Sequence, residues 1–305
     1  MKWIKKGLIY GPNGESSWAK DSALTPTPFL MDNEQIRVYA GFRDGVGVSR
    51  IGFVDLDAKD PSIILKISKD PVLDIGAPGT FDDNGVILGD IVPYENKLYM
   101  YYVGFQLVQK AKFLAFSGLA ISHDGGNTFE RYSKAPILDR IDQEIHIRAI
   151  HSVLVEESKW KIWYAAGNSW QWINNTQYPQ YHIKYIESYD GVNFNDHAQL
   201  CIDTCGDEYR IGRPRVTVQD NLYKMFYTKG TLSGDYIAGY AESLDGLNWK
   251  RMDDKIGISL SKSGWDSKAL CYPSLLNYQN NVYMFYNGND MGKAGFGLAI
   301  LDKSV

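Results

Sequence analysis

Charged side chains interrupt short apolar segments at recurring positions along this 305-residue chain. Asp90, Glu144 and Asp21 supply carboxyl groups, which can donate or accept protons during catalysis. Arg213 and Arg215 flank a proline that fixes the backbone between them. Because guanidinium groups bind carboxylates and phosphates in bidentate fashion, these residues predict a site that combines proton transfer with recognition of an anionic ligand.

Polar residues of this kind are costly to bury unless they are paired or solvated, so a pocket explains them better than a packed core does. We expect Asp90, Glu144 and Asp21 to be the catalytic groups of that pocket. The predicted ligand-binding residues share a cationic or tyrosine side chain: Arg43, His146, Arg148, His151, Arg213, Arg215, Lys268 and Tyr272. No oxygen-rich loop with calcium-ligand spacing accompanies them, so neither a metal nor another cofactor is predicted.

The elements that must position these residues repeat five times, at intervals of about 60 residues. Each copy has an acidic or aromatic start, an apolar segment, a tyrosine-rich segment and a third segment. The alternation of apolar and polar residues, rich in Tyr, Val, Ile and Phe, predicts β-strands. The tyrosine-rich strands are Ile36–Phe42, Lys97–Val103, Trp160–Ala166, Leu222–Thr228 and Asn281–Asn287. The third strands are Val48–Asp55, Phe116–Ser122, His182–Ser188, Ile237–Ser243 and Ala294–Leu301.

Three of the third strands run into nearly the same Ser-x-Asp-Gly turn, in which glycine supplies a positive φ at low steric cost. The fifth copy has no further strand after Leu301, and Trp3–Tyr10 is predicted to complete it. A fourth strand is predicted to close each of the other copies: Ile67–Leu73, Arg131–Leu138, His197–Ile202 and Arg251–Leu260.

These strands predict an all-β fold, a five-bladed β-propeller whose N-terminal strand completes the last blade, because a closed ring leaves only short, protected edges. A pair of β-sandwich domains is the alternative. We expect a single domain. Its blades are predicted at residues 18–75, 81–139, 143–203, 206–261 and 265–301, the last with strand 3–10.

Acidic residues at the start of several copies predict a structural role, because a scaffold contact should recur in every blade. Asp82, Asp207 and Asp266 are interpreted in this way, as acceptors in a turn that the blades share. Glu144 lies in a segment unlike any other copy, and Asp90 stands where other copies have Thr, Ser or Arg. These two residues are therefore the stronger candidates for chemistry.

Composition excludes some classes of function. The net charge of −4 does not favour nucleic acid or a membrane surface as partner, and no segment is long and apolar enough to span a bilayer. The N-terminal segment lacks the features of a signal peptide. Three cysteines without a disulfide framework predict a cytoplasmic protein. Cys201 and Cys205 are interpreted as ordinary thiols, with a metal half-site as the alternative.

Several motifs resemble those of a known superfamily. The segments Gly79–Asp90, Gly264–Pro273 and Tyr286–Asp290 resemble propeller proteins often described as glycosylases and encoded among bacterial surface-polysaccharide genes. Across its whole length the chain resembles the five-bladed propeller glycosidases of glycoside hydrolase families 32, 43, 62, 68, 117 and 130. The resemblance implies the propeller fold and a reaction at a glycosyl bond.

The sequence departs from the catalytic patterns of these families. The positions that match the family 43 carboxylates hold Thr25, Ile150 and Gly212, none of which transfers protons. The nucleophile motif of families 32 and 68 has only a loose counterpart in Trp18–Asp21. Family 130, which includes phosphorylases that hold phosphate with Arg, His and Tyr, is the closer analogy.

Three functional hypotheses remain. In the first, Asp90 and Glu144, with Asp21 as a third carboxylate, cleave or transfer a glycosyl group of an anionic sugar that the arginines hold. In the second, the protein is a nucleotide-sugar-dependent enzyme of surface-polysaccharide biosynthesis. In the third, it is a non-catalytic glycan-binding propeller. The insert Asn168–Tyr181 is expected to cap the pocket, and its tryptophans to stack on a sugar or to lie at a blade edge.

Overall fold

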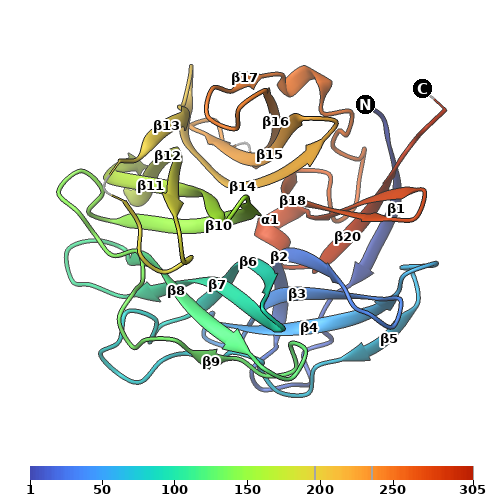
Figure 1. Ribbon diagram of the computed structural model, residues 1–305, viewed down its shortest axis with the longest axis horizontal. Coiled ribbons are helices and arrows are strands. Elements are labelled where there is room, and N and C mark those ends of the chain that lie inside the picture. The colour runs from blue at the N-terminus through green and yellow to red at the C-terminus, as the bar shows by residue number, and fades with distance from the viewer. Residues whose placement is uncertain (196, 235, 305) are drawn as a thin grey trace.

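The computed structural model describes residues 1–195, 197–234 and 236–304. Within these residues the strand pairings form five four-stranded antiparallel sets, which we call blades 1 to 5. The sets are arranged radially, with the first strand of each nearest the centre (Figure 1). The predicted β-propeller is confirmed.

The five blades follow one another along the chain. Blade 1 contains β2 (Asp21–Leu30), β3 (Gln35–Arg43), β4 (Ser49–Asp57) and β5 (Ile64–Ile67). Blade 2 contains β6 (Val86–Tyr94), β7 (Lys97–Gln106), β8 (Leu114–Ser122) and β9 (Glu130–Arg131). Blade 3 contains β10 (Ile147–Glu156), β11 (Lys159–Ile173), β12 (Thr176–Ser188) and β13 (Gln199–Ile202). Blade 4 contains β14 (Glu208–Gln219), β15 (Leu222–Thr231), β16 (Tyr236–Ser243) and β17 (Lys250–Arg251).

Blade 5 joins the two ends of the chain. It contains β18 (Ala269–Tyr278), β19 (Asn281–Asn287), β20 (Phe296–Leu301) and the N-terminal strand β1 (Trp3–Tyr10). β1 pairs antiparallel with β20, so the predicted completion of the last blade by the N-terminal strand is confirmed. A one-turn helix, α1 (Asn289–Gly292), lies near the centre of the ring beside β2 and β18 (Figure 1).

The outer strands are shorter than the sequence predicts. β9 and β17 have two residues each, and a 3-10 helix at Asp253–Lys255 ends the segment predicted as strand 251–260. In the segments 67–73 and 131–138 a proline removes a backbone donor, and each segment returns to its blade through a single bridge, Ile51 with Leu73 and Ser117 with Leu138. Short outer strands limit the unpaired edge that each blade exposes.

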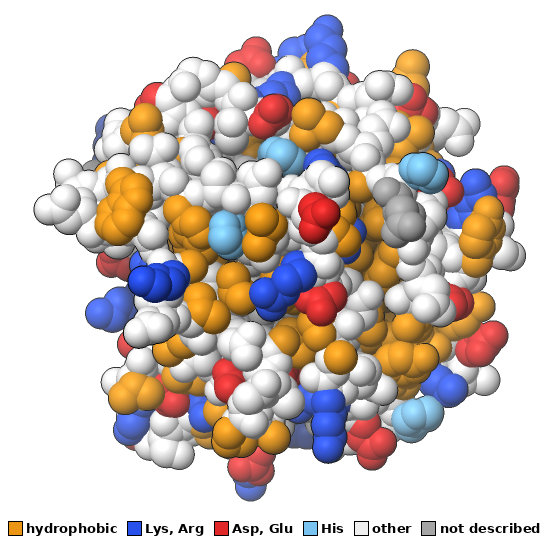
Figure 2. Space-filling model, turned by 90° about the vertical axis from the view of Figure 1, so that its left-hand side faces the viewer, with side chains coloured by type: hydrophobic (Ala, Val, Ile, Leu, Met, Phe, Trp, Pro, Cys, Tyr) orange, Lys and Arg blue, Asp and Glu red, His pale blue; other side chains and the backbone are white. Residues whose placement is uncertain are grey.

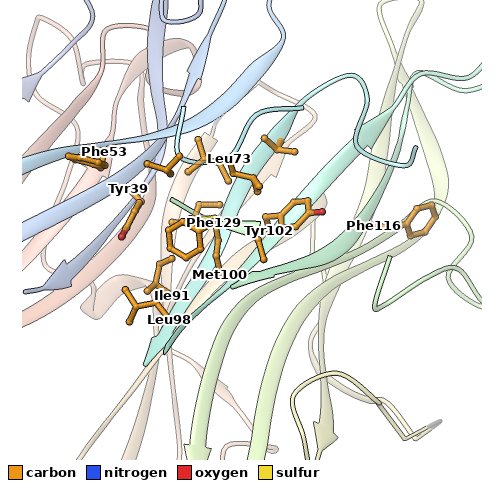
Figure 3. Packing of buried hydrophobic residues seen from close by; sticks show 14 of the residues in the cluster. Tyr39, Phe53, Leu73, Ile91, Leu98, Met100, Tyr102, Phe116 and Phe129 are labelled. Atoms are coloured by element: carbon orange, nitrogen blue, oxygen red, sulfur yellow. The ribbon is translucent and has the colours of Figure 1, made fainter. Parts of the chain in front are cut away.

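Apolar clusters between neighbouring blades hold the ring together. In one of these clusters Tyr39 and Phe53 of blade 1 lie beside Met100 and Phe129 of blade 2 (Figure 3). Edge-to-face contacts such as Tyr39 with Phe129, whose ring centroids are 5.9 Å apart, add to the burial of apolar area.

The repeated Ser-x-Asp-Gly turns connect adjacent blades. In each turn the serine Oγ accepts a glycine N–H and donates to the aspartate, which fixes the loop. An aromatic side chain of the preceding blade then donates to the glycine carbonyl: Tyr39 to Gly126 at 2.9 Å, Tyr101 to Gly191 at 2.8 Å and Trp163 to Gly246 at 2.9 Å. The turns therefore serve the scaffold.

Asn287 links blade 5 to blade 1. Its side chain is fully buried, its oxygen accepts the N–H of Thr25 at 2.8 Å, and its amide donates to the carbonyls of Ala23 and Gly295 at 2.9 and 2.8 Å. A buried amide that satisfies three backbone groups is costly to remove, so Asn287 fixes the position of the inner strand of blade 1.

The side of the molecule that faces left in Figure 1 shows acidic, basic and apolar side chains interspersed, without a large region of one charge (Figure 2). Within the described residues no helix has the length and apolar character that crossing a bilayer requires.

Candidate functional site

A cavity of about 420 Å³ opens at the centre of the ring. All five inner strands contribute to it, through Thr25 of β2, Ile87 of β6, His151 of β10, Arg213 of β14 and Tyr272 of β18. Loops and the second and third strands of blades 1 to 4 complete its walls, and the exposed Met291 of α1 also lines it. This volume lies in the range typical of small-molecule sites.

A bulge in every inner strand positions residues for the cavity. The pairing register shifts by one residue in each: between Leu24 and Thr27, Leu88 and Asp90, Ile150 and Ser152, Gly212 and Arg215, and Cys271 and Ser274. Thr25, Arg213 and Tyr272 have positive φ angles of 52°, 55° and 55°, and each precedes a proline. Non-glycine residues adopt such angles only where surrounding contacts enforce them, and bulges commonly redirect side chains at functional sites.

Arg213 lies at the base of the cavity and reaches three other blades. Its guanidinium donates to Leu88 and Gly89 carbonyls of blade 2, to Nδ1 of His151 in blade 3 at 3.1 Å, and to the Thr27 hydroxyl of blade 1 at 2.8 Å. Its Nε is buried without a hydrogen-bond partner among the described residues.

The charge of Arg213 has no carboxylate partner within hydrogen-bond distance in the described part of the chain. Burial, together with the nearby charge of Arg215, lowers the pKa of Arg213 to about 9, so the guanidinium still carries its charge at pH 7. A buried cation held only by neutral acceptors would be stabilised by a bound anion.

His151 is neutral at physiological pH. Burial, with the adjacent charges of Arg213 and Arg215, lowers the pKa of His151 well below 6.5. Because the Arg213 guanidinium only donates, His151 Nδ1 must accept and Nε2 carries the proton. The imidazole therefore offers one N–H donor to a ligand.

Arg210 forms the second cationic position, on the wall of the cavity. Its guanidinium carbon lies 4.9 Å from the ring centroid of Tyr209 and 4.6 Å from that of Tyr236. The Tyr236 hydroxyl donates to Tyr272 at 2.9 Å. The Nε of Arg210 is also buried without a hydrogen-bond partner among the described residues. Stacking on aromatic rings holds the guanidinium in place without neutralising it.

Two further cations, Arg43 and Lys112, complete the cationic part of the described lining. The Lys112 ammonium lies 5.1 Å from the Tyr178 ring. Neither Arg43 nor Lys112 forms an ion pair with another described residue. The lining thus contains four cationic side chains, and no aspartate or glutamate among the residues that the structure describes.

Glu144 lies outside this lining. Its carboxylate is buried and accepts from Arg148 at 2.7 Å, from Lys184 at 2.8 Å and from the Tyr164 hydroxyl at 3.0 Å. Each oxygen has a charged donor, and Arg148 also donates to the Asp139 carbonyl at 2.7 Å. Neither Glu144 nor Arg148 therefore faces a ligand in the cavity.

The same contact recurs in other blades. In blade 2 Asp82 accepts from Arg131 at 2.7 Å and from the Tyr102 hydroxyl at 3.1 Å. In blade 5 Asp266 accepts from Lys5 at 2.6 Å and from the Tyr286 hydroxyl at 3.0 Å. A carboxylate bound to an inner tyrosine and an outer cation is thus a structural unit of the repeat, and Glu144 is its version in blade 3.

Asp90 and Arg215 form an ion pair between blades. Arg215 Nη1 lies 2.6 Å from Asp90 Oδ1, and the other oxygen of Asp90 accepts the N–H of Val153 in blade 3 at 2.8 Å. Arg215 also donates to the His151 carbonyl at 3.1 Å. This buried pair joins blades 2, 3 and 4 and is not part of the lining.

The other predicted residues divide between the cavity and its surroundings. Arg43, His151, Arg213 and Tyr272 line the cavity. Asp21, His146 and Lys268 are not in the lining. Asp21 accepts from Ser22 at 2.6 Å, His146 packs against Trp170 with ring centroids 5.1 Å apart, and Lys268 is exposed. The structure therefore does not bring the three predicted carboxylates together in the cavity, and their catalytic roles stay predictions.

The insert 168–181 forms an extension of the β11–β12 hairpin, with Ser169 opposite Gln180 and Ile173 opposite Thr176. Tyr178, Pro179 and Tyr181 of this hairpin line the cavity, whereas its two tryptophans do not. Arg210 is one of the charged residues that the sequence places near the inner strands, but it was not among the predicted binding residues. Lys112, Tyr178, Tyr181 and Tyr236 were not predicted either. The position of Arg210 three residues before a bulge is the one signal that could have identified it.

Two curated proteins of Mycobacterium tuberculosis match the whole chain. "Uncharacterized protein Rv1502" of strain ATCC 25618 / H37Rv is 33% identical over 303 residues, which cover 99% of this chain and 100% of the relative. "Uncharacterized protein MT1551" of strain CDC 1551 / Oshkosh has the same identity and coverage. This chain belongs to their family. No protein-family model matches it.

Solved structures share the fold of this family member. One described as a "Glycoside hydrolase" has a TM-score of 0.74 at 17% identity and covers 97% of this chain and 90% of its own. One from work on "the GH130 family of mannoside phosphorylases" has a TM-score of 0.71 at 15% identity, with coverage of 99% and 94%. A "thermostable family-43 glycoside hydrolase" has a TM-score of 0.68 at 16% identity, with coverage of 95% and 94%. At these identities the similarity concerns the fold.

Proposed function

We propose that the protein binds an anionic glycosyl compound in the central cavity and cleaves or transfers its glycosyl group. The observation that carries this proposal is the lining: Arg43, Lys112, Arg210 and Arg213 are cationic, and no described lining residue is a carboxylate. Cations that lack counter-charges in a partly desolvated cavity favour an anionic ligand. The propeller fold, shared with glycoside-acting proteins, supports a carbohydrate as the rest of that ligand.

The chemistry of the leaving group indicates which class of glycosyl compound the cavity suits. Cleavage of an ordinary glycoside requires a carboxylic acid to protonate the leaving oxygen and a second carboxylate on the other face of the sugar. A phosphate or nucleoside diphosphate leaves as an anion, and fixed cationic donors stabilise the charge that develops on it. A cavity with four cations and no described carboxylate therefore suits a glycosyl phosphate or a nucleotide-sugar.

The lining residues have separate roles in this proposal. Arg210 and Arg213 place positive charge beside the phosphate oxygens, because both side chains line the cavity and neither has a carboxylate partner among the described residues. The neutral His151 donates from Nε2 without adding charge. The carboxylates of Asp90 and Glu144 keep structural roles, because charged donors already hold them.

A non-catalytic binding propeller is the second candidate. The same observation favours it, since a cavity without a described proton-transferring carboxylate can bind an anionic glycan without cleaving it.

The proposal is tested by ³¹P NMR of the purified protein incubated with hexose 1-phosphates and nucleoside diphosphate sugars, with and without acceptor sugars. Release of phosphate or nucleotide, slowed in Arg43→Gln and unchanged in the exposed control Lys268→Gln, would support it. Binding of these compounds without turnover would favour the second candidate. Turnover of neutral oligosaccharides alone, followed by ¹H NMR in parallel incubations, would overturn both.

A further inference from the structure

We infer that the phosphate of the ligand carries, besides its glycosyl group, an apolar alcohol: an aliphatic chain or ring system of several carbons. This inference rests on the proposed function, which supplies the phosphate, and adds the chemical class of the group attached to it.

One wall of the cavity is mainly apolar. We call it the apolar wall; its residues come from blades 2 and 3 and form a hydrophobic cluster of their own. They are Ile87, Val103, Phe105, Phe113, Ala115, Ile147, Ala149, Ala165 and Tyr181. Apart from the Tyr181 hydroxyl, none of these side chains can donate or accept a hydrogen bond.

This cluster differs from those that hold the blades together. Between blades 1 and 2 large side chains such as Tyr39, Phe53 and Phe129 fill the space (Figure 3). In the apolar wall three alanines, Ala115, Ala149 and Ala165, occupy inward positions, and every member of the cluster also lines the cavity. The apolar wall therefore borders empty space in the cavity, whereas side chains fill the space between the blades in the other clusters.

A sugar is a poor occupant for such a surface. Sugar hydroxyl groups that face the aliphatic and phenylalanine side chains of this wall lose their hydrogen bonds to water and gain none, which costs free energy for each buried group. Methylene groups gain free energy on the same surface, because their burial removes apolar area from water.

Blades 4 and 5 contribute the buried charge. Arg210, Arg213 and Tyr236 of blade 4 and Tyr272 of blade 5 line the cavity there, whereas Lys112 lies at the edge of the apolar wall, against the Tyr178 ring. A ligand that satisfies both sides must present oxyanions to the cationic side and hydrocarbon to the apolar wall. A phosphate ester of an apolar alcohol has both an oxyanion group and a hydrocarbon group, joined directly through the ester oxygen.

The mouth of the cavity continues the apolar surface. Leu107 and Met291 line the cavity and are exposed to solvent. An alkyl chain longer than the cavity would extend through the mouth and contact these two side chains there. Both compact and long-chain phosphate esters therefore fit the cavity.

Isothermal titration calorimetry with methyl, butyl, hexyl, octyl and dodecyl phosphate tests the inference, with inorganic phosphate and octyl glucoside as references. Each methylene that reaches the apolar wall should tighten binding about fourfold. A gain that stops at hexyl or octyl phosphate indicates a compact natural ligand, and a gain that continues to dodecyl phosphate indicates a lipid phosphate.

Two variants separate the two sides of the cavity. Arg210→Met should weaken binding of every phosphate by a similar factor, about 10-fold or more, and leave the gain per methylene unchanged. Ile87→Thr keeps the branched shape, places a hydroxyl in the apolar wall, and should weaken octyl phosphate more than methyl phosphate. Leu107→Ser, at the exposed rim, repeats the test without risk to folding and should affect only the longer esters.

The outcomes distinguish this inference from the proposed function. Phosphates that bind with no dependence on chain length overturn the inference and leave the proposed function standing. Octyl glucoside that binds as tightly as octyl phosphate, or no binding by any phosphate, overturns both.

Discussion

Charged groups occur in two contrasting regions of this propeller. Between and within the blades each buried carboxylate has a cationic partner, as in the pairs of Glu144 with Arg148 and of Asp90 with Arg215. In the central cavity Arg210 and Arg213 have no carboxylate partner among the described residues. A paired charge serves the fold, whereas an unpaired charge in a cavity is kept at a cost to stability and therefore indicates a ligand.

The largest effect is expected where a paired charge is broken. Glu144→Gln leaves Arg148 and Lys184 without a full counter-charge and should lower the free energy of unfolding by about 3–5 kcal/mol. Urea unfolding measures this, with the exposed Glu157→Gln as control. A variant that keeps its stability and loses turnover would instead give Glu144 a catalytic role.

An unpaired charge should behave in the opposite way. Arg210→Met should lower the affinity for a sugar phosphate by about 10- to 100-fold, because a charge-assisted hydrogen bond is lost. It should leave the unfolding free energy unchanged or raise it, since no hydrogen bond of Arg210 to the described residues is broken. Arg148→Met, the matched paired arginine, should destabilise the protein. Equal destabilisation by the two substitutions would remove the contrast between the regions.

Acid should weaken the turns that connect the blades. Partial burial opposes ionisation of Asp124, but hydrogen bonds from Ser122 and Thr128 lower its pKa to about 2. Partial burial also opposes ionisation of Asp190, and hydrogen bonds from Asn193 lower the pKa of that residue to about 2. An unfolded aspartate titrates near about 3.9, so these groups stabilise the fold above about pH 4 and lose that effect as the pH falls through 2.

Thermal unfolding between pH 6 and pH 2 measures this loss. The double variant Asp124→Asn and Asp190→Asn should show a smaller fall in melting temperature below pH 4 than the wild type. An identical fall in both proteins would assign the acid sensitivity to other carboxylates.

The smallest effects are expected at the edge of the cavity. Arg43→Ala should weaken phosphate binding about two- to fivefold, as is usual for a partly solvated charge, and Lys268→Ala, which is exposed outside the lining, should not change it. Isothermal titration measures both. A larger loss in Lys268→Ala than in Arg43→Ala would move the binding site away from the cavity.

The fold could be predicted largely from the sequence, because a repeat of period-two strands leaves few alternatives. β19 begins and ends where the tyrosine-rich pattern places it, and β1 spans the predicted Trp3–Tyr10. The outer strands could not be predicted as well. Each outer strand pairs with only one neighbouring strand. A proline or a short helix can therefore end that pairing without disturbing the core.

The site could be predicted only in part. His151, Arg213 and Tyr272 line the cavity because each follows or occupies the bulge that the inner strands share. Glu144 was a candidate because its sequence neighbourhood is unique, but its partner Lys184 comes from a strand 40 residues away, and that contact is visible only in three dimensions. Lys112 and Tyr178 lie on loops and hairpins that have no equivalent in the other copies, so an alignment of the repeats could not reveal them.

The central claim is that the cavity selects an anion. Titration of the wild-type protein with hexose 1-phosphates and with the matching methyl glycosides, repeated with Arg210→Met, tests it most directly. We expect that at least one 1-phosphate binds, that its methyl glycoside does not bind measurably, and that Arg210→Met weakens binding of the phosphate by about 10-fold or more. Equal binding of phosphate and methyl glycoside, unaffected by Arg210→Met, would contradict it.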